Sequence, residues 1–340
     1  MTFVLAHPSP QTDAKELAKI LRERGAARVE ENSFVVLETD RIQEIAGTFG
    51  VARVSMAIEC ESQFAAISKA IAEVGRRTVL QGQGFFVKVH LLTDRDFAAR
   101  DLEFAATGAL AAELAGVASS AKNEEEASAK IVAYVGMRRA FVCLKEYEGA
   151  GGAPAGALGS ASCAITGPLS LASCIAACKA GFSLPELLLL YGDEDDLCRN
   201  AKIARSLAEK TTRAKSQKIA IAKMTAVHPR DGRIRMLQFD LAAARALAGM
   251  MKSKNVVLPL SLATHPQWFI EMIMKEIVGA GKVPLVPLMF SEIDYAKEEQ
   301  DARRVTRQEF MKSKKTALEK PRHVRLEVGP DYLHDIIDSV

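Results

Sequence analysis

The sequence predicts an α/β protein whose second half is a doubly wound parallel sheet, preceded by two smaller α+β units. Residues 162–288 contain five short apolar stretches separated by helical segments, the order typical of parallel sheets. Stretches such as 187–191 are apolar throughout, as expected of strands that are buried on both faces. Five glycines in residues 148–161 predict a loop between the two halves of the chain.

The first half divides into two predicted units. Within residues 1–60, stretches rich in bulky or β-branched residues alternate with stretches whose apolar residues have helical spacing, which predicts a β-α-β-α-β order. The expected strands are 2–6, 33–39 and 51–60, and the expected helices are 13–24 and 40–46. The second unit is predicted to contain helices at 63–79 and 94–118 and strands at 84–91, 129–135 and 139–145. Residues 119–129 include three consecutive glutamates and are expected to form a solvated connection.

In the second half of the chain, the sequence predicts that strands and helices alternate regularly. The expected strands are residues 162–165, 187–191, 217–224, 255–260 and 283–288. The expected helices are residues 169–180, 196–210, 233–252 and 267–279. The remaining residues, 296–340, are charged and are predicted to form a basic tail, partly helical, with a strand-like stretch at 324–328.

Composition excludes several classes of protein. Hydrophobic residues make up 49% of the 340 residues and the net charge is +3, which excludes a disordered chain. The longest apolar run is too short to span a bilayer, and the first residues lack the pattern of a signal peptide, so we expect a soluble cytoplasmic protein without a membrane partner. The six cysteines include no CxxC pair, which predicts free thiols in a reducing compartment.

The near-neutral net charge conceals an uneven distribution. Residues 199–235 and 303–325 together hold 20 of the 45 basic residues and 4 of the 42 acidic ones, a net charge of +16. The other 280 residues therefore carry −13. A solvated helix face could explain one such stretch, but two of them favour a surface that follows the phosphates of RNA. Aromatic residues make up only 6%, so base stacking is expected to contribute little.

Three stretches of the sequence carry a resemblance to a known family. GFFVKVH at 84–90 precedes RDFAARDLEFAATGAL at 95–110, YEGAGGAPAGALG spans 147–159, and SCAITGPLSLASCIAACKAG spans 162–181. In this order the chain resembles the tRNA 4-thiouridine synthetases. The resemblance implies a ferredoxin-like domain at 1–60, a THUMP domain at 61–147, a glycine-rich linker at 148–161, a PP-loop domain at 162–295 and the basic tail at 296–340. In that family the first two domains bind tRNA, and the PP-loop domain adenylates uridine with ATP and Mg²⁺ before sulfur is delivered.

The resemblance is incomplete at the nucleotide loop. Thr166, Gly167 and Ser170 align with the first Ser, the first Gly and the last Ser of the family's SGGxDS motif, in a loop one residue shorter. Pro168 replaces the second Gly and has no N–H to offer a phosphate. Leu169 stands where the family has its aspartate. The resemblance therefore implies a nucleotide site built on Thr166, Gly167 and Ser170 whose catalytic motif is eroded.

Three other family features are also missing. The family's TGE-type loop is replaced by residues 259–266, and Phe239 stands where an arginine is expected after the Arg235–Met236 pair. No cysteine follows Cys198, so the late cysteine that bacterial members use for sulfur transfer is absent. Whether the chain is an enzyme is therefore left open, and no residue is assigned a catalytic role.

Several other groups could form sites. Cys163, Cys174, Cys178 and Cys198 could bind metal or sulfur, but packing in an Ala-rich core is the preferred interpretation. The acidic stretch 193–196 could hold a divalent cation, although capping of the next helix is preferred. His228 and His265 have no ligand partner at metal-binding spacing, so we expect structural roles and no metal site. The residues predicted to contact RNA are Lys88, Arg95, Arg100, Arg138, Arg139, Lys145, Arg213, Lys215, Lys218 and Arg233.

The sequence thus supports a preferred function and two alternatives. The preferred hypothesis is a tRNA-binding protein of the thiouridine-synthetase type, involved in tRNA thiolation, with tRNA as partner and an eroded ATP-pyrophosphatase site. It could present tRNA to an active synthetase or to a sulfur donor. The first alternative is an active sulfurtransferase that uses ATP, Mg²⁺ and an external sulfur donor. The second is a nucleotide-binding module without an RNA role. Because the family often dimerises, the resemblance also implies a homodimer.

Overall fold

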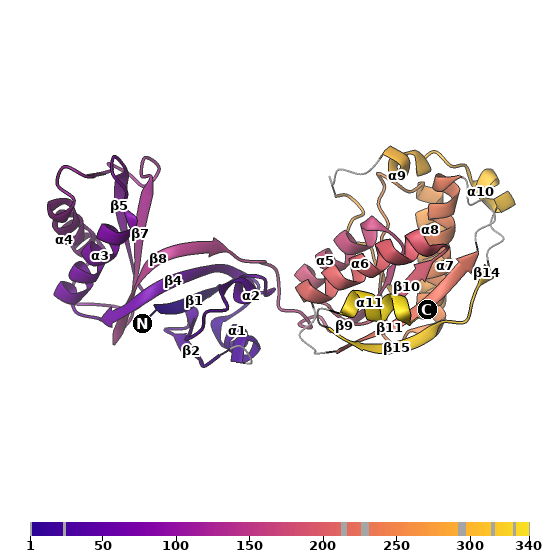
Figure 1. The fold of residues 1–340 in the computed structure, drawn as a ribbon, viewed down its shortest axis with the longest axis horizontal. Helices are drawn as coiled ribbons and strands as arrows, with labels where there is room; N and C mark the ends of the chain where they lie inside the picture. Colours follow the sequence, from indigo (N-terminus) through magenta and orange to yellow (C-terminus); the bar gives the residue numbers. More distant parts are fainter. Residues whose placement is uncertain are drawn as a thin grey trace. The chain divides into compact units, whose positions relative to one another are not determined.

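The chain forms two compact units, residues Met1–Gly152 and Ala153–Val340, and their boundary lies within the glycine-rich segment. The computed structural model describes residues 2–22, 25–211, 216–225, 231–291, 297–313, 317–328 and 331–339. Figure 1 shows the course of the chain through both units. No helix in these described ranges is both long and apolar enough to cross a membrane.

The first unit is built on one continuous eight-stranded sheet in the order β2-β3-β1-β4-β8-β7-β5-β6. Its strands are β1 (Thr2–Pro8), β2 (Ala27–Glu30), β3 (Phe34–Leu37), β4 (Val51–Glu61), β5 (Gly84–Leu91), β6 (Ser119–Ser120), β7 (Ala129–Val135) and β8 (Arg139–Glu148). Its helices are α1 (Ala14–Leu21), α2 (Ile42–Ala46), α3 (Phe64–Thr78) and α4 (Ala99–Glu113). The long antiparallel pair β4 and β8 joins the two predicted α+β units edge to edge.

The helices of the first unit bury two apolar clusters against the sheet. Leu17 and Leu21 of α1 pack on β1 and β3, and α3 and α4 pack on β5, β7 and β8. A third cluster lies between strands alone, where Phe34 of β3 contacts Tyr134 of β7 with ring centroids 5.2 Å apart. Because three strands separate β3 from β7 in the sheet, this contact requires a strongly curled sheet.

Three expectations for the first unit need correction. Strand β2 was not predicted, because it is half-buried and carries Arg28 and Glu30 in place of an apolar pattern. It joins β3 through Glu31 and Asn32, both at positive φ, as in a tight hairpin. The 94–118 helix is shorter than predicted, since Arg95 donates to backbone carbonyls and holds residues 94–98 outside α4. The connection at 119–129 includes the two-residue strand β6.

The second unit is a largely parallel sheet in the order β13-β12-β9-β10-β11, to which β14 and β15 add as antiparallel strands. Its strands are β9 (Ser160–Ile165), β10 (Ser183–Tyr191), β11 (Ser216–Thr225), β12 (Asn255–Val257), β13 (Val283–Leu285), β14 (Ala317–Leu318) and β15 (Arg322–Glu327). Its helices are α5 (Pro168–Ala180), α6 (Glu194–Thr211), α7 (Gly232–Met250), α8 (Gln267–Gly279), α9 (Lys297–Ala302), α10 (Arg307–Ser313) and α11 (Tyr332–Asp338).

The α/β class and the five parallel strands agree with the sequence prediction, but the sheet is mixed, not purely parallel. The two antiparallel strands come from the segment predicted as a basic tail. The strand-like stretch expected at 324–328 is part of β15, where exposed basic residues alternate with half-buried apolar ones, as is typical of an edge strand. The two-residue strand β14 was not predicted. After β15 the chain returns to the core, where Tyr332 is buried and donates its hydroxyl hydrogen to Gln217 Oε1 at 3.0 Å.

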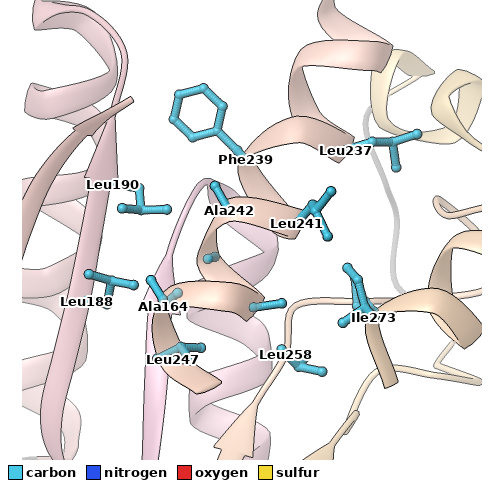
Figure 2. Close-up of a cluster of buried hydrophobic side chains, with 14 of the residues drawn as sticks. Ala164, Leu188, Leu190, Leu237, Phe239, Leu241, Ala242, Leu247, Leu258 and Ile273 are labelled. Carbon is cyan, nitrogen blue, oxygen red and sulfur yellow. The ribbon is translucent and has the colours of Figure 1, made fainter. Parts of the chain in front are cut away.

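The core on one face of this sheet lies under α7 and α8. Leu190 of β10 faces Ala242 of α7, and on the other side of that helix Leu241 faces Ile273 of α8, so that the three elements share one cluster (Figure 2). Because both neighbouring strands of β10 are parallel and both sheet faces are covered, Leu187 to Leu190 are all completely buried. This packing holds the loops at the carboxyl ends of β9 and β12 in place.

Candidate functional site

A cavity of about 260 Å³ lies at the carboxyl ends of β9 and β12. The chain proceeds from β9 to β10 on one side and from β12 to β13 on the other, so the loops after these neighbouring strands diverge. Such a topological switch point is where open α/β sheets bind ligands. The β9–α5 loop, Pro259 after β12, and side chains of α6 and α7 line what we call the switch-point cavity.

The β9–α5 loop is closed by its own hydroxyl groups. The Thr166 N–H donates to Ser170 Oγ at 3.0 Å, and the two hydroxyl oxygens are 3.3 Å apart. Ser170 is completely buried and lies outside the residues that line the cavity, whereas Thr166 and Gly167 line it. Of the three residues predicted to bind a nucleotide, two therefore face the cavity and one braces the loop.

Gly167 is the N-cap of α5 and leaves this helix end without a side-chain cap. Its backbone is extended at φ 169°, and a Cβ added there would meet no atom within 4 Å. A helix N-terminus that opens into a cavity attracts anions, because its unpaired N–H groups and the helix dipole both favour negative charge. Pro168 at the first helical position reduces the number of those donors by one.

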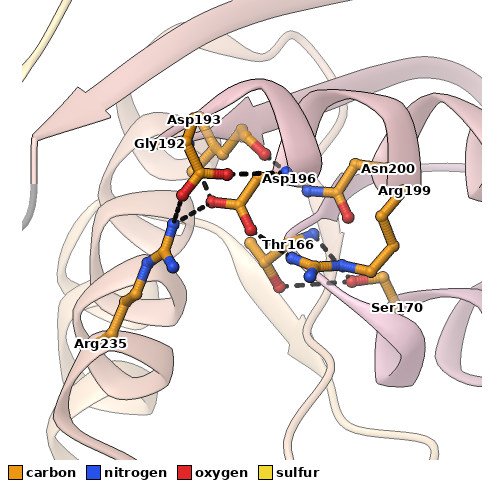
Figure 3. Close-up of polar contacts among 9 residues, drawn as sticks. Thr166, Ser170, Gly192, Asp193, Asp196, Arg199, Asn200 and Arg235 are labelled. Atoms are coloured by element: carbon orange, nitrogen blue, oxygen red, sulfur yellow. Dashed lines mark hydrogen bonds and ion pairs between the residues drawn. The ribbon is translucent and has the colours of Figure 1, made fainter. Parts of the chain in front are cut away.

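Two arginines line the cavity and share one buried carboxylate (Figure 3). Asp196 of α6 forms ion pairs with Arg199 on its own helix and with Arg235 of α7. Its Oδ2 also accepts the N–H of Gly192 at 3.0 Å. Because Asp196 is only 4% exposed, its charge is desolvated and requires these partners. Arg235 also stacks over Phe239, at 5.5 Å from the ring centroid.

The acidic stretch 193–196 caps a helix. Asp193 Oδ1 accepts the Asp196 N–H at 2.9 Å, and Asp193 Oδ2 pairs with Arg235 at 2.6 Å. The hydrogen bond from the Asp196 backbone, helped by Arg235, lowers the pKa of Asp193 below its ordinary value. Within the described ranges, no group of three acidic, histidine or cysteine side chains is arranged to hold a metal ion.

A second buried carboxylate, Asp240 of α7, links two loops. Asp240 Oδ1 accepts the Thr166 hydroxyl at 3.0 Å, and Oδ2 lies 3.0 Å from His265 Nε2. The other ring nitrogen of His265 lies 2.8 Å from Thr264 Oγ1. His265 is completely buried and ties the loop after β12 to the loop after β9. The sequence carries no signal for this pair, since 25 residues and a whole strand separate the two side chains.

The cysteines are not all free. A disulfide joins Cys163 of β9 to Cys174 of α5, so the expectation of free thiols is wrong for this pair. The β9–α5 turn folds the helix back over the strand and brings their Cα atoms within 6.7 Å. Cys178 lies one turn further along α5, completely buried, and burial raises the pKa of its thiol to about 12. Cys198 is exposed on α6.

Three of the predicted RNA contacts in the first unit are engaged within the protein. Arg95 donates to the carbonyls of Met137 at 2.8 Å and of Gly136 at 3.3 Å, and it also contacts the carbonyl of Ser62. Lys88 pairs with Glu103 at 3.5 Å. Arg139 pairs with Glu59 at 2.7 Å.

The other three predicted contacts in that unit are exposed. Arg100, Arg138 and Lys145 form no ion pair with another described residue. The Lys145 ammonium lies 5.0 Å from the ring centroid of Tyr147. These positions stay predictions.

The predicted contacts in the second unit fall into two groups. Arg213 and Lys215 lie outside the described residues. Lys218 of β11 pairs loosely with Glu186 at 3.8 Å. Arg233 is exposed at the start of α7, where Asp231 binds its guanidinium at 3.1 Å and raises its pKa above the ordinary value.

Comparison with known structures identifies the fold. The chain is similar to PH1313 from Pyrococcus horikoshii Ot3, with 16% identity and a TM-score of 0.63 over 86% of this chain and 95% of that one. It is also similar to a 4-thiouridine synthetase solved in complex with RNA and bound ATP, with 12% identity and a TM-score of 0.65 over 89% of this chain and 84% of that one. No family model and no curated protein matches the sequence. The resemblance predicted from three sequence stretches is therefore confirmed at the level of the fold.

Proposed function

We propose that this protein binds tRNA within a tRNA-modification process of the 4-thiouridine synthetase type, and that its switch-point cavity binds a nucleotide weakly without cleaving it. Support for the RNA half comes from the shared fold, since the synthetase of that fold was solved with RNA. The +16 charge of residues 199–235 and 303–325 supports it independently. In this proposal the first unit comprises ferredoxin-like and THUMP domains.

The proposal that a nucleotide binds without being cleaved rests on one observation: both buried carboxylates near the switch-point cavity already have partners within the protein. ATP is bound in the related synthetase, and the open α5 N-terminus with Arg199 and Arg235 fits a phosphate here. Mg²⁺ fits less well, because Asp196 is taken up by two arginines and Asp240 by Thr166 and His265. Leu169 offers no carboxylate in their place. Phosphate binding without metal-assisted turnover is the chemistry that this set of residues supports.

Gly167→Asp tests the nucleotide half. An aspartate fits the open N-cap and is a favourable cap, so the thermal midpoint should stay the same or rise slightly. Its negative charge at the helix N-terminus should weaken ATP binding about tenfold. Gly167→Asn is the matched control, since it caps the helix without the charge and should bind ATP like the wild type. Equal ATP affinity in both variants would contradict a nucleotide site at this helix.

Two assays on the wild-type protein separate the three functions. Binding of a tRNA transcript should weaken steeply with added salt, and no AMP or pyrophosphate should form from ATP in its presence. Release of AMP and pyrophosphate that requires tRNA would replace this proposal with an active sulfurtransferase that uses an external sulfur donor. Failure to bind tRNA at low salt, with ATP still bound, would leave a nucleotide-binding module.

A further inference from the structure

The two basic stretches of the sequence meet in the fold. Strand β15 pairs antiparallel with β11 along the sheet edge, as Figure 1 shows, and this places Arg325 opposite Lys218 and His323 opposite Ala220. Directly paired residues project from the same face of a sheet. A cation from each basic stretch therefore lies on one face, although 107 positions separate the two residues in the chain.

That face carries a second cavity, of about 360 Å³, which we call the edge cavity. Lys218, His323 and Arg325 line it from the strands, Lys252 lines it from the segment after α7, and Glu186 of β10 completes the charged groups. Glu186 and Lys218 occur early in β10 and β11, so the edge cavity lies toward the amino ends of the parallel strands. The switch-point cavity lies at the opposite ends of the strands, their carboxyl ends.

The charges of the edge cavity are not balanced. Its lining holds three permanent cations and one carboxylate, and the Glu186 carboxylate is 3.8 Å from the Lys218 ammonium. Lys252 is exposed and forms no ion pair with another described residue. Arg325 donates its Nε–H to Ser216 Oγ at 2.9 Å, and this hydrogen bond orients the guanidinium. The two terminal nitrogens of the guanidinium take no part in that hydrogen bond. An oriented guanidinium beside two ammonium groups is suited to the oxygens of a phosphate.

We propose that the edge cavity binds a backbone phosphate of the RNA, so that tRNA contacts the β11–β15 edge of the sheet. This inference rests on the proposed RNA binding and adds a surface to it. An extended polyanion fits better than a small free anion, because the cations of the cavity are exposed side chains from three separate segments, Lys218 of β11, Arg325 of β15 and Lys252 after α7. A free phosphate is the competing occupant that the experiment separates.

The test compares how tRNA binding depends on salt in the wild type and in variants in which a charged side chain is replaced by a neutral one. Binding of a tRNA transcript is measured between about 50 and 200 mM salt for the wild type and for the double variant Lys218→Gln/Arg325→Gln. The double variant should bind roughly tenfold more weakly at the low-salt end, and its slope of log K against log salt should fall by about 1–2. Lys275→Gln removes one exposed charge from α8, outside both cavities, and should change neither quantity appreciably.

A variant with the opposite sign separates an RNA contact from a folding defect. Glu186→Gln removes the one carboxylate among the described residues that line the edge cavity and should strengthen tRNA binding about two- to threefold. A thermal melt followed by circular dichroism checks that each variant is folded. Loss of binding in all variants, including Glu186→Gln, would contradict an electrostatic contact at this cavity.

The remaining outcomes are distinct. If the wild type fails to bind tRNA, both the proposed function and this inference fail. If the wild type binds and the double variant keeps the same affinity and slope, only the edge contact is wrong. If titration with inorganic phosphate shows binding that the double variant loses, while the RNA slope is unchanged, the cavity holds a free anion and the RNA contact is overturned.

Discussion

The two cavities of the second unit lie toward opposite ends of the parallel strands, and they differ in whether their basic side chains have acidic partners. In the switch-point cavity, Arg199 and Arg235 both pair with the buried Asp196. In the edge cavity, Lys252 and Arg325 have no carboxylate partner among the described residues, and Glu186 lies 3.8 Å from Lys218. Balanced arginines act as part of the framework, whereas unbalanced cations create an attractive potential for anions. Charge balance therefore indicates that the switch-point cavity attracts anions only weakly, as expected of a weak nucleotide site, and that the edge cavity attracts a polyanion more strongly.

The largest expected effect comes from Asp196→Ala, which removes the shared carboxylate. Breaking a buried ion pair typically costs about 3–5 kcal/mol, and the partial exposure of both arginines reduces this to roughly 2–3 kcal/mol of unfolding free energy. Urea unfolding followed by the fluorescence of Trp268, the single tryptophan, reports on this unit. Glu276→Ala is the matched control, because its pair with Arg245 is exposed and should be worth less than about 1 kcal/mol. Equal losses would contradict a special role for Asp196.

The first unit shows what happens to a buried ionisable group without a counter-charge. Burial, with Arg53 and His90, lowers the pKa of His7 from 6.5 to about 3, so the native state excludes the proton that the unfolded chain binds. Stability of this unit should therefore fall as the pH drops below about 6.5, by about 2 kcal/mol between pH 7 and pH 5. Hydrogen exchange of the β1 and β4 amides measures it. In His7→Gln this part of the pH dependence should disappear, and an unchanged slope would refute the assignment.

A smaller effect is expected from Gly192→Ala, which probes how tightly the Asp196 network is packed. The new Cβ would lie 3.0 Å from Arg235 Nη2, 3.1 Å from Phe239 Cζ and 3.2 Å from Asp196 Oδ2, so these groups must shift. We expect a loss of about 1 kcal/mol in unfolding free energy. Gly249→Ala, on α7 with no atom within 4 Å, should instead stabilise the unit by about 0.5–1 kcal/mol. A gain at both positions would show that the network tolerates displacement.

The smallest effect is expected in the edge cavity. Lys252→Gln removes a cation that has no ion-pair partner among the described residues, so the unfolding free energy should change by less than about 0.5 kcal/mol. Urea unfolding under the conditions used for Asp196→Ala gives a direct comparison. A loss as large as that of Asp196→Ala would mean that the edge cavity is also part of the framework.

Elements with a clear local pattern were predictable. The strand Gly84–Leu91 and the helix Gln267–Gly279 have the bounds that periodicity indicated. The edge strand β2 was not identified, and β15 was indicated only as a strand-like stretch at 324–328, since half-exposed strands carry charged residues where an apolar pattern would be needed. Their identity as strands depends on a partner, and sequence periodicity does not report the partner.

Cavity residues could be named in advance only within one loop. Thr166 and Gly167, which the resemblance to the SGGxDS motif singled out, line the switch-point cavity, and their role in nucleotide binding stays a prediction. Arg199, Arg235 and the Asp240–His265 pair were missed as cavity residues, because they come together from α6, α7 and the loop after β12. The Cys163–Cys174 pairing was missed for the same reason, since eleven residues and a reversal of chain direction separate the two sulfurs.

The pairing of β11 with β15 has a consequence for synthesis on the ribosome. Arg325 reaches Ser216 across 109 residues, so at about 5–20 residues per second β11 emerges roughly 5–20 s before its partner strand. During that interval the outer edge of the parallel sheet has no strand to cover it. Unpaired edges of this kind recruit other chains, and the exposed lysines Lys218 and Lys223 on β11 would discourage such pairing while the nascent chain waits.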